Sequence, residues 1–345
     1  MNNTMQKRIK VLGIITCIAT AVLTVLWGIL VATSREEDLP GYFKNGVSGV
    51  YVFYGILAAA GVFFLLSLFL LRKAETPRMQ DGLPSVFFLS AACGFLLIAY
   101  TAVLFIVRVF GGMKESGGRG LFAAAAVLAL AAAGGFFFRM LPEGWVSSRA
   151  RETVTGILGL SATLFALLYS LACYFDMSLM MNSPFKWMDQ LFFMVLAFFF
   201  LAETGLRLEK AKFGTYLVLA AAAFCLGIVN GVGGIAAFLA SGGESALRDS
   251  VLHDFLQLTL GLYCAIRFLA GVLAYNRKNS VILSGVKDEA IRVAAREEAI
   301  RAEKSAEIQA KHAKKEVEME EDGIRQQTID DISPTEDDSH GEESR

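Results

Sequence analysis

Eight long apolar segments limit most strongly what this chain can fold into. Each is near 20 residues or longer, and about 20 residues of helix, at 1.5 Å per residue, cross a hydrocarbon core about 30 Å thick. The segments lie at approximately 11–32, 50–71, 85–110, 121–141, 155–177, 187–208, 214–240 and 251–275. The sequence therefore predicts an all-α polytopic membrane protein, with a bundle of about eight transmembrane helices.

The composition favours the same class. Hydrophobic residues make up 55% of the 345, and the mean hydropathy is +0.52, which is more apolar than a soluble domain needs to be. Strands are disfavoured because the segments are continuous rather than alternating, and because lipid cannot satisfy an open sheet edge. The first segment is too long for the apolar part of a signal peptide, so we interpret it as a retained helix.

The charges of the loops predict an orientation. Loops on one side of the predicted bundle carry twelve basic residues before the tail begins, and those on the other side carry six. The twelve are Lys7, Arg8, Lys10, Arg72, Lys73, Arg78, Arg139, Arg149, Arg151, Arg207, Lys210 and Lys212. The positive-inside rule then predicts a protein of the cytoplasmic (plasma) membrane with both its N-terminus and its C-terminus in the cytoplasm.

The last 70 residues differ from the rest of the chain. Residues 276–345 hold 12 of the 32 basic and 18 of the 33 acidic side chains. The stretch 287–322 has no Pro or Gly and is rich in strong helix formers, so we predict a charged cytoplasmic helix, either single or weakly paired as a coiled coil. The stretch 323–345 is acidic and polar, which predicts a disordered tail. The predicted domains are thus a transmembrane domain, 1–277, followed by this helix and this tail.

The transmembrane domain could be a 4+4 repeat, with halves at 1–150 and 151–277. The octapeptide GIITCIAT (13–20) resembles GILGLSAT (156–163), and the two would occupy equivalent places in a parallel repeat. Apolar helices also match one another by chance, so both interpretations stay open.

Two ionisable residues lie well inside predicted helices, where a charge is costly and functional roles concentrate. Glu203 is about one and a half turns from the cytoplasmic end of the segment 187–208, and Arg267 is about two turns from the same end of 251–275. Glu203 could bond to Arg207 on its own helix or to Arg267 across the bundle. Arg267 could instead extend its side chain toward the headgroups.

A glycine-rich stretch surrounds Asn230. Gly227 and Gly231 have the G-x-x-x-G spacing that lets helices approach closely, and an amide between them can bond to a neighbouring helix. The alternative is a helix broken in mid-membrane, with Asn230 exposed at a solute site.

A set of polar residues gathers at the predicted outer ends of three segments. The set comprises Asp176, Asp189, Gln190, His253, Asp254 and Gln257. If these side chains converge they could bind a solute or a divalent cation, whereas helix ends are also polar simply because water is there. We predict no bound cofactor and no resident metal.

Several functional classes lack their motifs. The chain has no H-E-x-x-H, no G-x-S-x-G and no P-loop sequence, and His253 is its only histidine within a predicted membrane segment. An acidic tail would repel phosphates, so nucleic acid is not a predicted partner.

Three functional hypotheses follow. The leading one is a non-enzymatic anchor or scaffold in the lipid bilayer that presents residues 287–345 to a cytoplasmic protein, with self-association as a further option. The second is a small-solute or ion permease whose pathway lies among the fifth to eighth helices. The third is an intramembrane enzyme acting on a lipid substrate, for which only Glu203 and the pair His253 and Asp254 could serve; whether the protein is an enzyme stays open.

Overall fold

The computed structural model describes residues 3–36, 41–74, 84–110, 119–138, 140, 148–175, 182–208, 210–240 and 251–275. Within these ranges eight helices are long and apolar enough to cross a membrane, which confirms the predicted helical, multi-pass membrane class. The β-structure among the described residues is one isolated bridge between Arg35 and Phe43. The predicted helix 287–322 and the acidic tail 323–345 lie outside the described residues.

The helices occupy the places that the apolar segments predict. Their bounds are α1 Asn3–Thr33, α2 Ser48–Leu70, α3 Pro84–Val103, α4 Arg119–Phe138, α5 Ser148–Phe175, α6 Pro184–Arg207, α7 Phe213–Ala240 and, for the eighth helix, Val251–Tyr275. A π-helix, η1 (Leu104–Phe110), continues α3 and accounts for the rest of the third segment. α1 begins about eight residues before its apolar segment, because the basic flank joins the helix.

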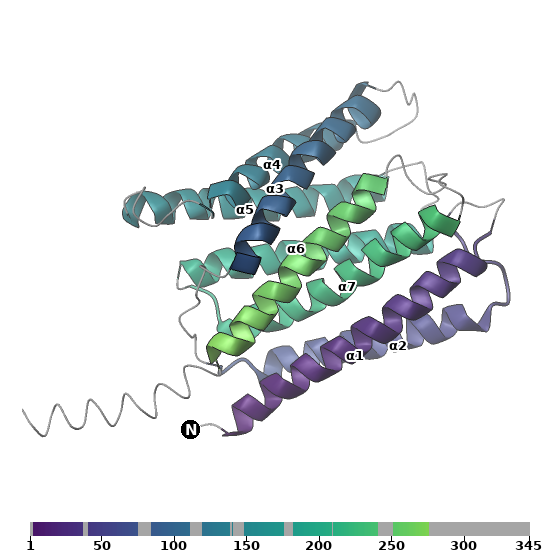
Figure 1. The fold of residues 1–345 in the computed structure, drawn as a ribbon, viewed down its shortest axis with the longest axis horizontal. Coiled ribbons are helices and arrows are strands. Elements are labelled where there is room, and N and C mark those ends of the chain that lie inside the picture. The colour runs from purple at the N-terminus through teal and green to yellow at the C-terminus, as the bar shows by residue number, and fades with distance from the viewer. Residues whose placement is uncertain are drawn as a thin grey trace, which may run out of the picture. The chain divides into compact units, whose positions relative to one another are not determined.

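The helices pack as two flanks with a shared centre. α1 and α2 pack against α7 on one flank, and α3, α4 and α5 form the other, where α5 packs against α6 (Figure 1). α6 and α7 contact each other between the flanks. α7 has 67% of its most apolar stretch buried, whereas α2 has 17%. α2 therefore presents most of its apolar surface outward, as a helix in lipid does.

The eighth helix touches helices of both flanks. Thr259 accepts a hydrogen bond from Cys93 of α3 at its carbonyl, and the ring of Tyr263 meets Phe136 of α4 at a centroid distance of 5.2 Å. On the other flank, Phe268 is the side chain nearest to Gly13 of α1. The eighth helix is thus a common contact of elements far apart in the sequence.

α7 and the eighth helix cross at a pair of glycines. A Cβ built on Gly227 would lie 2.6 Å from the Cα of Gly261, and one built on Gly231 would lie 2.6 Å from the Cβ of Leu258. Both distances are shorter than real Cβ contacts, so only glycine permits this approach. The G-x-x-x-G spacing of α7 therefore serves close helix packing.

Aromatic rings join α1, α2 and α6 near the C-terminal end of α1 and the N-terminal end of α2. Trp27 stacks on Phe53 at 4.7 Å and meets Phe185 at 5.1 Å, both between ring centroids. The hydroxyl of Ser183 donates to the carbonyl of Gly41 over 2.9 Å, which fixes the start of α6 to the connection between α1 and α2. Pro184 follows at the first position of α6, where its missing N–H costs no helical hydrogen bond.

Candidate functional site

Two polar clusters lie between α6 and the eighth helix. We define the Glu203 cluster as Glu203, Arg207, Tyr263 and Arg267, and the His253 cluster as Tyr100, Tyr169, Asp189, His253 and Gln257. The contact between Glu203 and Arg267 joins residues 64 positions apart, as does that between Asp189 and His253. The two contacts lie 14 residues apart on both helices, about 21 Å at helical rise, so α6 and the eighth helix run in the same direction.

The Glu203 cluster is an enclosed ion pair with a second cation and one hydroxyl donor beside it. The Oε1 of Glu203 lies 2.8 Å from the Nε of Arg267 and 3.7 Å from an Nη of Arg207, and it accepts a hydrogen bond of 2.8 Å from the hydroxyl of Tyr263. Glu203 is 0% exposed and Arg267 1%. The carboxylate therefore bonds along its own helix and across the bundle at once, and Arg267 is held in the interior instead of reaching toward headgroups.

Tyr216 on α7 adds a contact to the same region. Its hydroxyl donates to the backbone carbonyl of Arg267 over 3.3 Å, and its ring lies 5.7 Å from that of Phe199 on α6. α7 thereby supports the segment of the eighth helix that carries the arginine. The surroundings of the ion pair are aromatic, which lowers the local dielectric and strengthens the attraction between the two charges.

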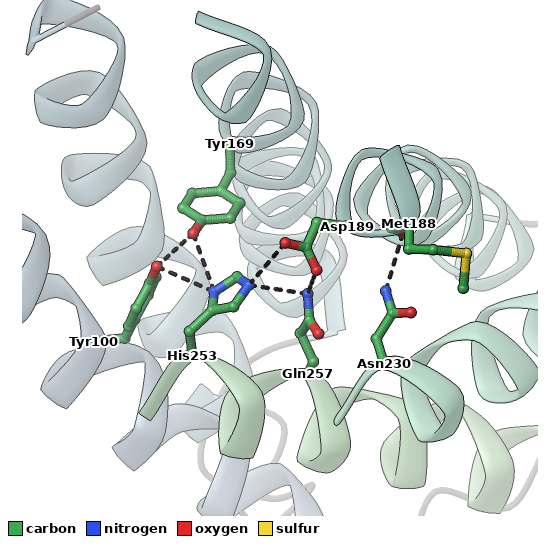
Figure 2. Close-up of polar contacts among 7 residues, drawn as sticks. All are labelled: Tyr100, Tyr169, Met188, Asp189, Asn230, His253 and Gln257. Carbon is green, nitrogen blue, oxygen red and sulfur yellow. Dashed lines mark hydrogen bonds and ion pairs between the residues drawn. The ribbon is translucent and has the colours of Figure 1, made fainter. Parts of the chain in front are cut away.

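The His253 cluster is a chain of hydrogen bonds that joins α3, α5, α6 and the eighth helix (Figure 2). The hydroxyls of Tyr100 and Tyr169 are hydrogen-bonded to each other. The Nδ1 of His253 lies 3.2 Å from the first hydroxyl and 3.1 Å from the second. The histidine is 2% exposed, so all these contacts are shielded from solvent.

The other nitrogen of His253 faces a carboxylate and an amide. Its Nε2 lies 3.0 Å from the Nε2 of Gln257 and 3.7 Å from the Oδ2 of Asp189. The same amide nitrogen donates to the Oδ1 of Asp189 over 2.7 Å, while the Oε1 of Gln257 is buried with no hydrogen-bond partner. The amide nitrogen of Gln257 therefore contacts both the imidazole and the carboxylate, which also face each other directly (Figure 2).

Asn230 binds a neighbouring helix near this cluster. Its Nδ2 donates to the backbone carbonyl of Met188 over 3.0 Å (Figure 2), and its Oδ1 is buried without a partner. α7 is continuous from Phe213 to Ala240, so the alternative of a helix broken at Asn230 is wrong. The amide joins α7 to α6 at the level of the His253 cluster.

The structure also places two other residues of the predicted outer set, Asp254 and Gln190. Asp254 packs against Gly234 of α7, where a Cβ on the glycine would overlap its carboxylate. The carbonyl of Gln190 accepts a hydrogen bond from Ser170 of α5 over 3.2 Å, so this part of α6 faces α5. Asp176 lies outside the described residues. Among the described residues no three His, Cys, Asp or Glu side chains gather as a metal site would need.

Apolar side chains fill the level between the two clusters. Leu196 of α6 and Leu260 of the eighth helix are 0% and 1% exposed and belong to the buried core. Two hollows lie elsewhere. One of about 520 Å³ lies between α2, α6 and α7, and one of about 620 Å³ lies between α5 and α6, both with mainly apolar linings.

Three tyrosines of the two clusters escape prediction from the sequence. Tyr100, Tyr169 and Tyr263 lie in apolar helices and carry no charge, so a search for ionisable residues passes over them. One feature could have indicated them: a phenol buried in an apolar helix needs a hydrogen-bond partner for its hydroxyl. The three residues are 5%, 3% and 1% exposed, and each bonds to a residue on another helix.

Comparison with known proteins gives no relative whose function could be compared with these two clusters. No protein-family model matches the sequence, and neither a curated protein nor a solved structure matches the chain.

Proposed function

We propose that this protein is a multi-pass anchor of the cytoplasmic membrane whose bundle holds residues 276–345 at the inner surface for a cytoplasmic protein partner. The observation that carries the proposal is the closed packing between the two polar clusters. Leu196 and Leu260, which lie between them, are 0% and 1% exposed. A bundle with a filled centre supports a holding role better than a conducting one.

The ionisable residues support the same role. A buried ion pair contributes little net stability, because desolvation offsets most of the attraction, but breaking one costs about 3–5 kcal/mol. Glu203 with Arg267, and Asp189 with Gln257, therefore fix the register between α6 and the eighth helix. A fixed register keeps the end of the eighth helix, and the chain that follows Tyr275, in one place.

The orientation is part of the proposal. If all eight candidate spans cross the membrane, residues 1 and 276 lie on the same side, and the excess of Lys and Arg in the loops of that side favours the cytoplasm. The acidic composition of residues 323–345 favours a partner with a basic surface, because opposite charges steer association.

The test compares three forms of the protein in cells, by in-cell crosslinking and identification of the attached proteins. The forms are the full chain, a chain without residues 280–345, and a control in which residues 280–345 keep their composition in shuffled order. We expect the same basic partner on the full chain only. The anchor proposal is wrong if the truncated chain keeps every partner and every cellular effect of the full one.

A second candidate function is a small-solute or ion permease among α5, α6, α7 and the eighth helix. The observation in its favour is His253, a buried titratable group bonded to α3, α5 and α6 in the half of the bundle that we assign to the outer side. Purified protein in liposomes with an internal dye for protons or sodium tests it. Ion flux above that of empty liposomes, abolished by Asp189→Asn, would favour the permease over the anchor.

An enzymatic role at Glu203 finds no support in the contacts of its side chain. The carboxylate is fully buried and bound by Arg267, Arg207 and Tyr263, so a lipid could reach it only after these contacts break. His253 and Asp254 are neighbours in sequence but contact different helices, since the first faces α3 and α5 and the second packs on α7.

A further inference from the structure

The hydrogen bonds around His253 identify which of its nitrogens carries the proton. The amide nitrogen of Gln257 is only a donor, and it lies 3.0 Å from the Nε2 of His253. The Nε2 must therefore accept and carry no proton. The imidazole is neutral in this arrangement, with its single proton on Nδ1, where it can bond to the hydroxyl of Tyr169 or Tyr100.

The amide of Gln257 uses both its protons in this state. One is donated to the Oδ1 of Asp189 over 2.7 Å and the other to the imidazole. The cost is the Oε1 of Gln257, which is buried with no partner. A buried acceptor without a partner is destabilising, so this arrangement of the Gln257 amide carries an energetic cost.

A proton added to the lone pair of Nε2 changes the contacts at once. The new N–H bond leaves an imidazolium donor facing the amide donor of Gln257 at the present 3.0 Å, which is repulsive. The amide of Gln257 must then give up its contact with the imidazole. The imidazolium can bond directly to the carboxylate, whose Oδ2 is already 3.7 Å away. The product is a buried pair of opposite charges.

Titratable groups from three packed helices face His253. α6 brings Asp189, α5 brings Tyr169 and α3 brings Tyr100. Gln257 lies one turn along the same helix as His253. Two further charged residues stand nearby in sequence: the buried Lys186, one turn before Asp189 on α6, and Asp254, which packs on α7. The carboxylate of Asp189, 3.7 Å from the Nε2 of His253, is the anion that faces the imidazole from α6.

We propose that the His253 cluster is an intramembrane proton-binding site, in which His253 takes up one proton at Nε2, Asp189 balances the charge, and the amide of Gln257 is displaced from the imidazole. The ligand is a proton, taken from water. The proposal does not rest on the anchor function, because a proton at this site changes a contact between α6 and the eighth helix whatever the tail binds.

The test uses nitrogen NMR of the histidines in the full chain. His312→Gln and His340→Gln leave His253 as the only histidine, and both changes lie in the tail, far from the cluster in sequence. The protein, labelled with ¹⁵N at histidine, is placed in liposomes and measured between about pH 4 and about pH 9. Protonated and unprotonated imidazole nitrogens have well-separated signals.

We expect one protonated nitrogen, Nδ1, at the alkaline end and two at the acidic end. In Asp189→Asn the second proton should require a roughly tenfold higher proton concentration, because the balancing anion is gone. In Gln257→Leu it should bind more readily, since no amide donor has to be displaced. Gln190→Leu, a change next to Asp189 on the side of α6 that faces α5, is the matched control and should leave the titration unchanged.

The proposal is overturned if His253 keeps a single protonated nitrogen over the whole range, and this first measurement needs no change within the cluster. Two variants give a second way to overturn it. The proposal is wrong if His253 titrates but Asp189→Asn and Gln257→Leu titrate as the control does. Both variants must first show the helicity and the gel-filtration elution volume of the protein with the unaltered cluster. Variants that fail to fold leave the first measurement to decide.

Discussion

Glu203 on α6 and Arg267 on the eighth helix form an ion pair of 2.8 Å inside the bundle, with no more than 1% of either residue exposed. The two helices are parallel. Glu203 and Arg267 are 64 positions apart in the sequence, and so are Asp189 and His253 in the other cluster. Because both contacts depend on one register, a slide of the eighth helix by a single turn would break both.

Removal of Arg267 should be the most damaging single change. Arg267→Met removes the closest cation from the buried carboxylate of Glu203, which should lower the free energy of unfolding by about 3–5 kcal/mol. Arg207→Met is the control, since Arg207 lies 3.7 Å from the carboxylate and its side chain is 20% exposed; it should cost about 1 kcal/mol or less. Unfolding by SDS in mixed micelles measures both.

The double variant Glu203→Gln with Arg267→Met separates the pair from its parts. It removes both charges, so it should be more stable than Arg267→Met alone. A double variant that is as unstable as the sum of the two single changes would contradict a coupled ion pair.

Glycine at position 261 should be required for the contact of α7 with the eighth helix. In Gly261→Ala the new methyl carbon would lie 2.9 Å from the backbone of Gly227, so the helices must separate, at a cost of about 1–3 kcal/mol. Gly28→Ala on α1 meets nothing within 4 Å and should be neutral or slightly stabilising, because alanine favours helix. Equal unfolding curves for the two variants would show that the glycine contact is unimportant.

A polar bond between helices should be weaker than the ion pair. Asn230→Ala removes the hydrogen bond to the carbonyl of Met188, which should cost about 0.5–1.5 kcal/mol. Thr24→Val provides the contrast, since the Thr24 hydroxyl is buried without a partner and its loss should cost nothing. The same SDS titration compares them, and a larger loss at position 24 would contradict the assignment.

The proposed orientation is tested by labelling from the outside of intact cells. In a chain whose five cysteines are replaced by alanine, Lys44→Cys and Lys212→Cys each place one thiol at an exposed position. A membrane-impermeant maleimide should label residue 44 in intact cells and residue 212 only after the cells are opened. Labelling of residue 212 from outside would reverse the proposed topology.

The sequence carries much of the fold because lipid leaves a chain few choices. A continuous apolar segment must form a helix that satisfies its own backbone, so segment positions predict helix positions almost directly. The same logic missed η1, since nothing in the composition of Leu104–Phe110 distinguishes π from α geometry. The helix order in space also escaped, because lipid-facing and buried faces here are both made of Ala, Leu and Phe.

The polar contacts of charged side chains could be predicted, because a charge in the membrane is costly. Those of uncharged side chains could not. Glu203 and Arg267 are conspicuous because a charge inside a membrane needs a partner, and matched depth suggested which partner. Tyr100 and Tyr169 are not conspicuous, since a tyrosine is tolerated in lipid and at its edge alike. No residue pattern indicates that the hydroxyls of these two tyrosines, 69 positions apart in the sequence, come together.

The paired clusters also have a consequence for synthesis of the chain. α6 and the eighth helix have mean hydropathies of 1.6 and 1.7 over their most apolar stretches, the lowest of the eight described spans. A charge such as that of Arg267 costs about 2.5–3.5 kcal/mol when a helix enters the bilayer alone. α6 leaves the ribosome first, so Glu203 is already in the membrane when Arg267 emerges. We therefore expect the eighth helix to insert more readily when α6 is already in the membrane, because Glu203 can then balance the charge of Arg267.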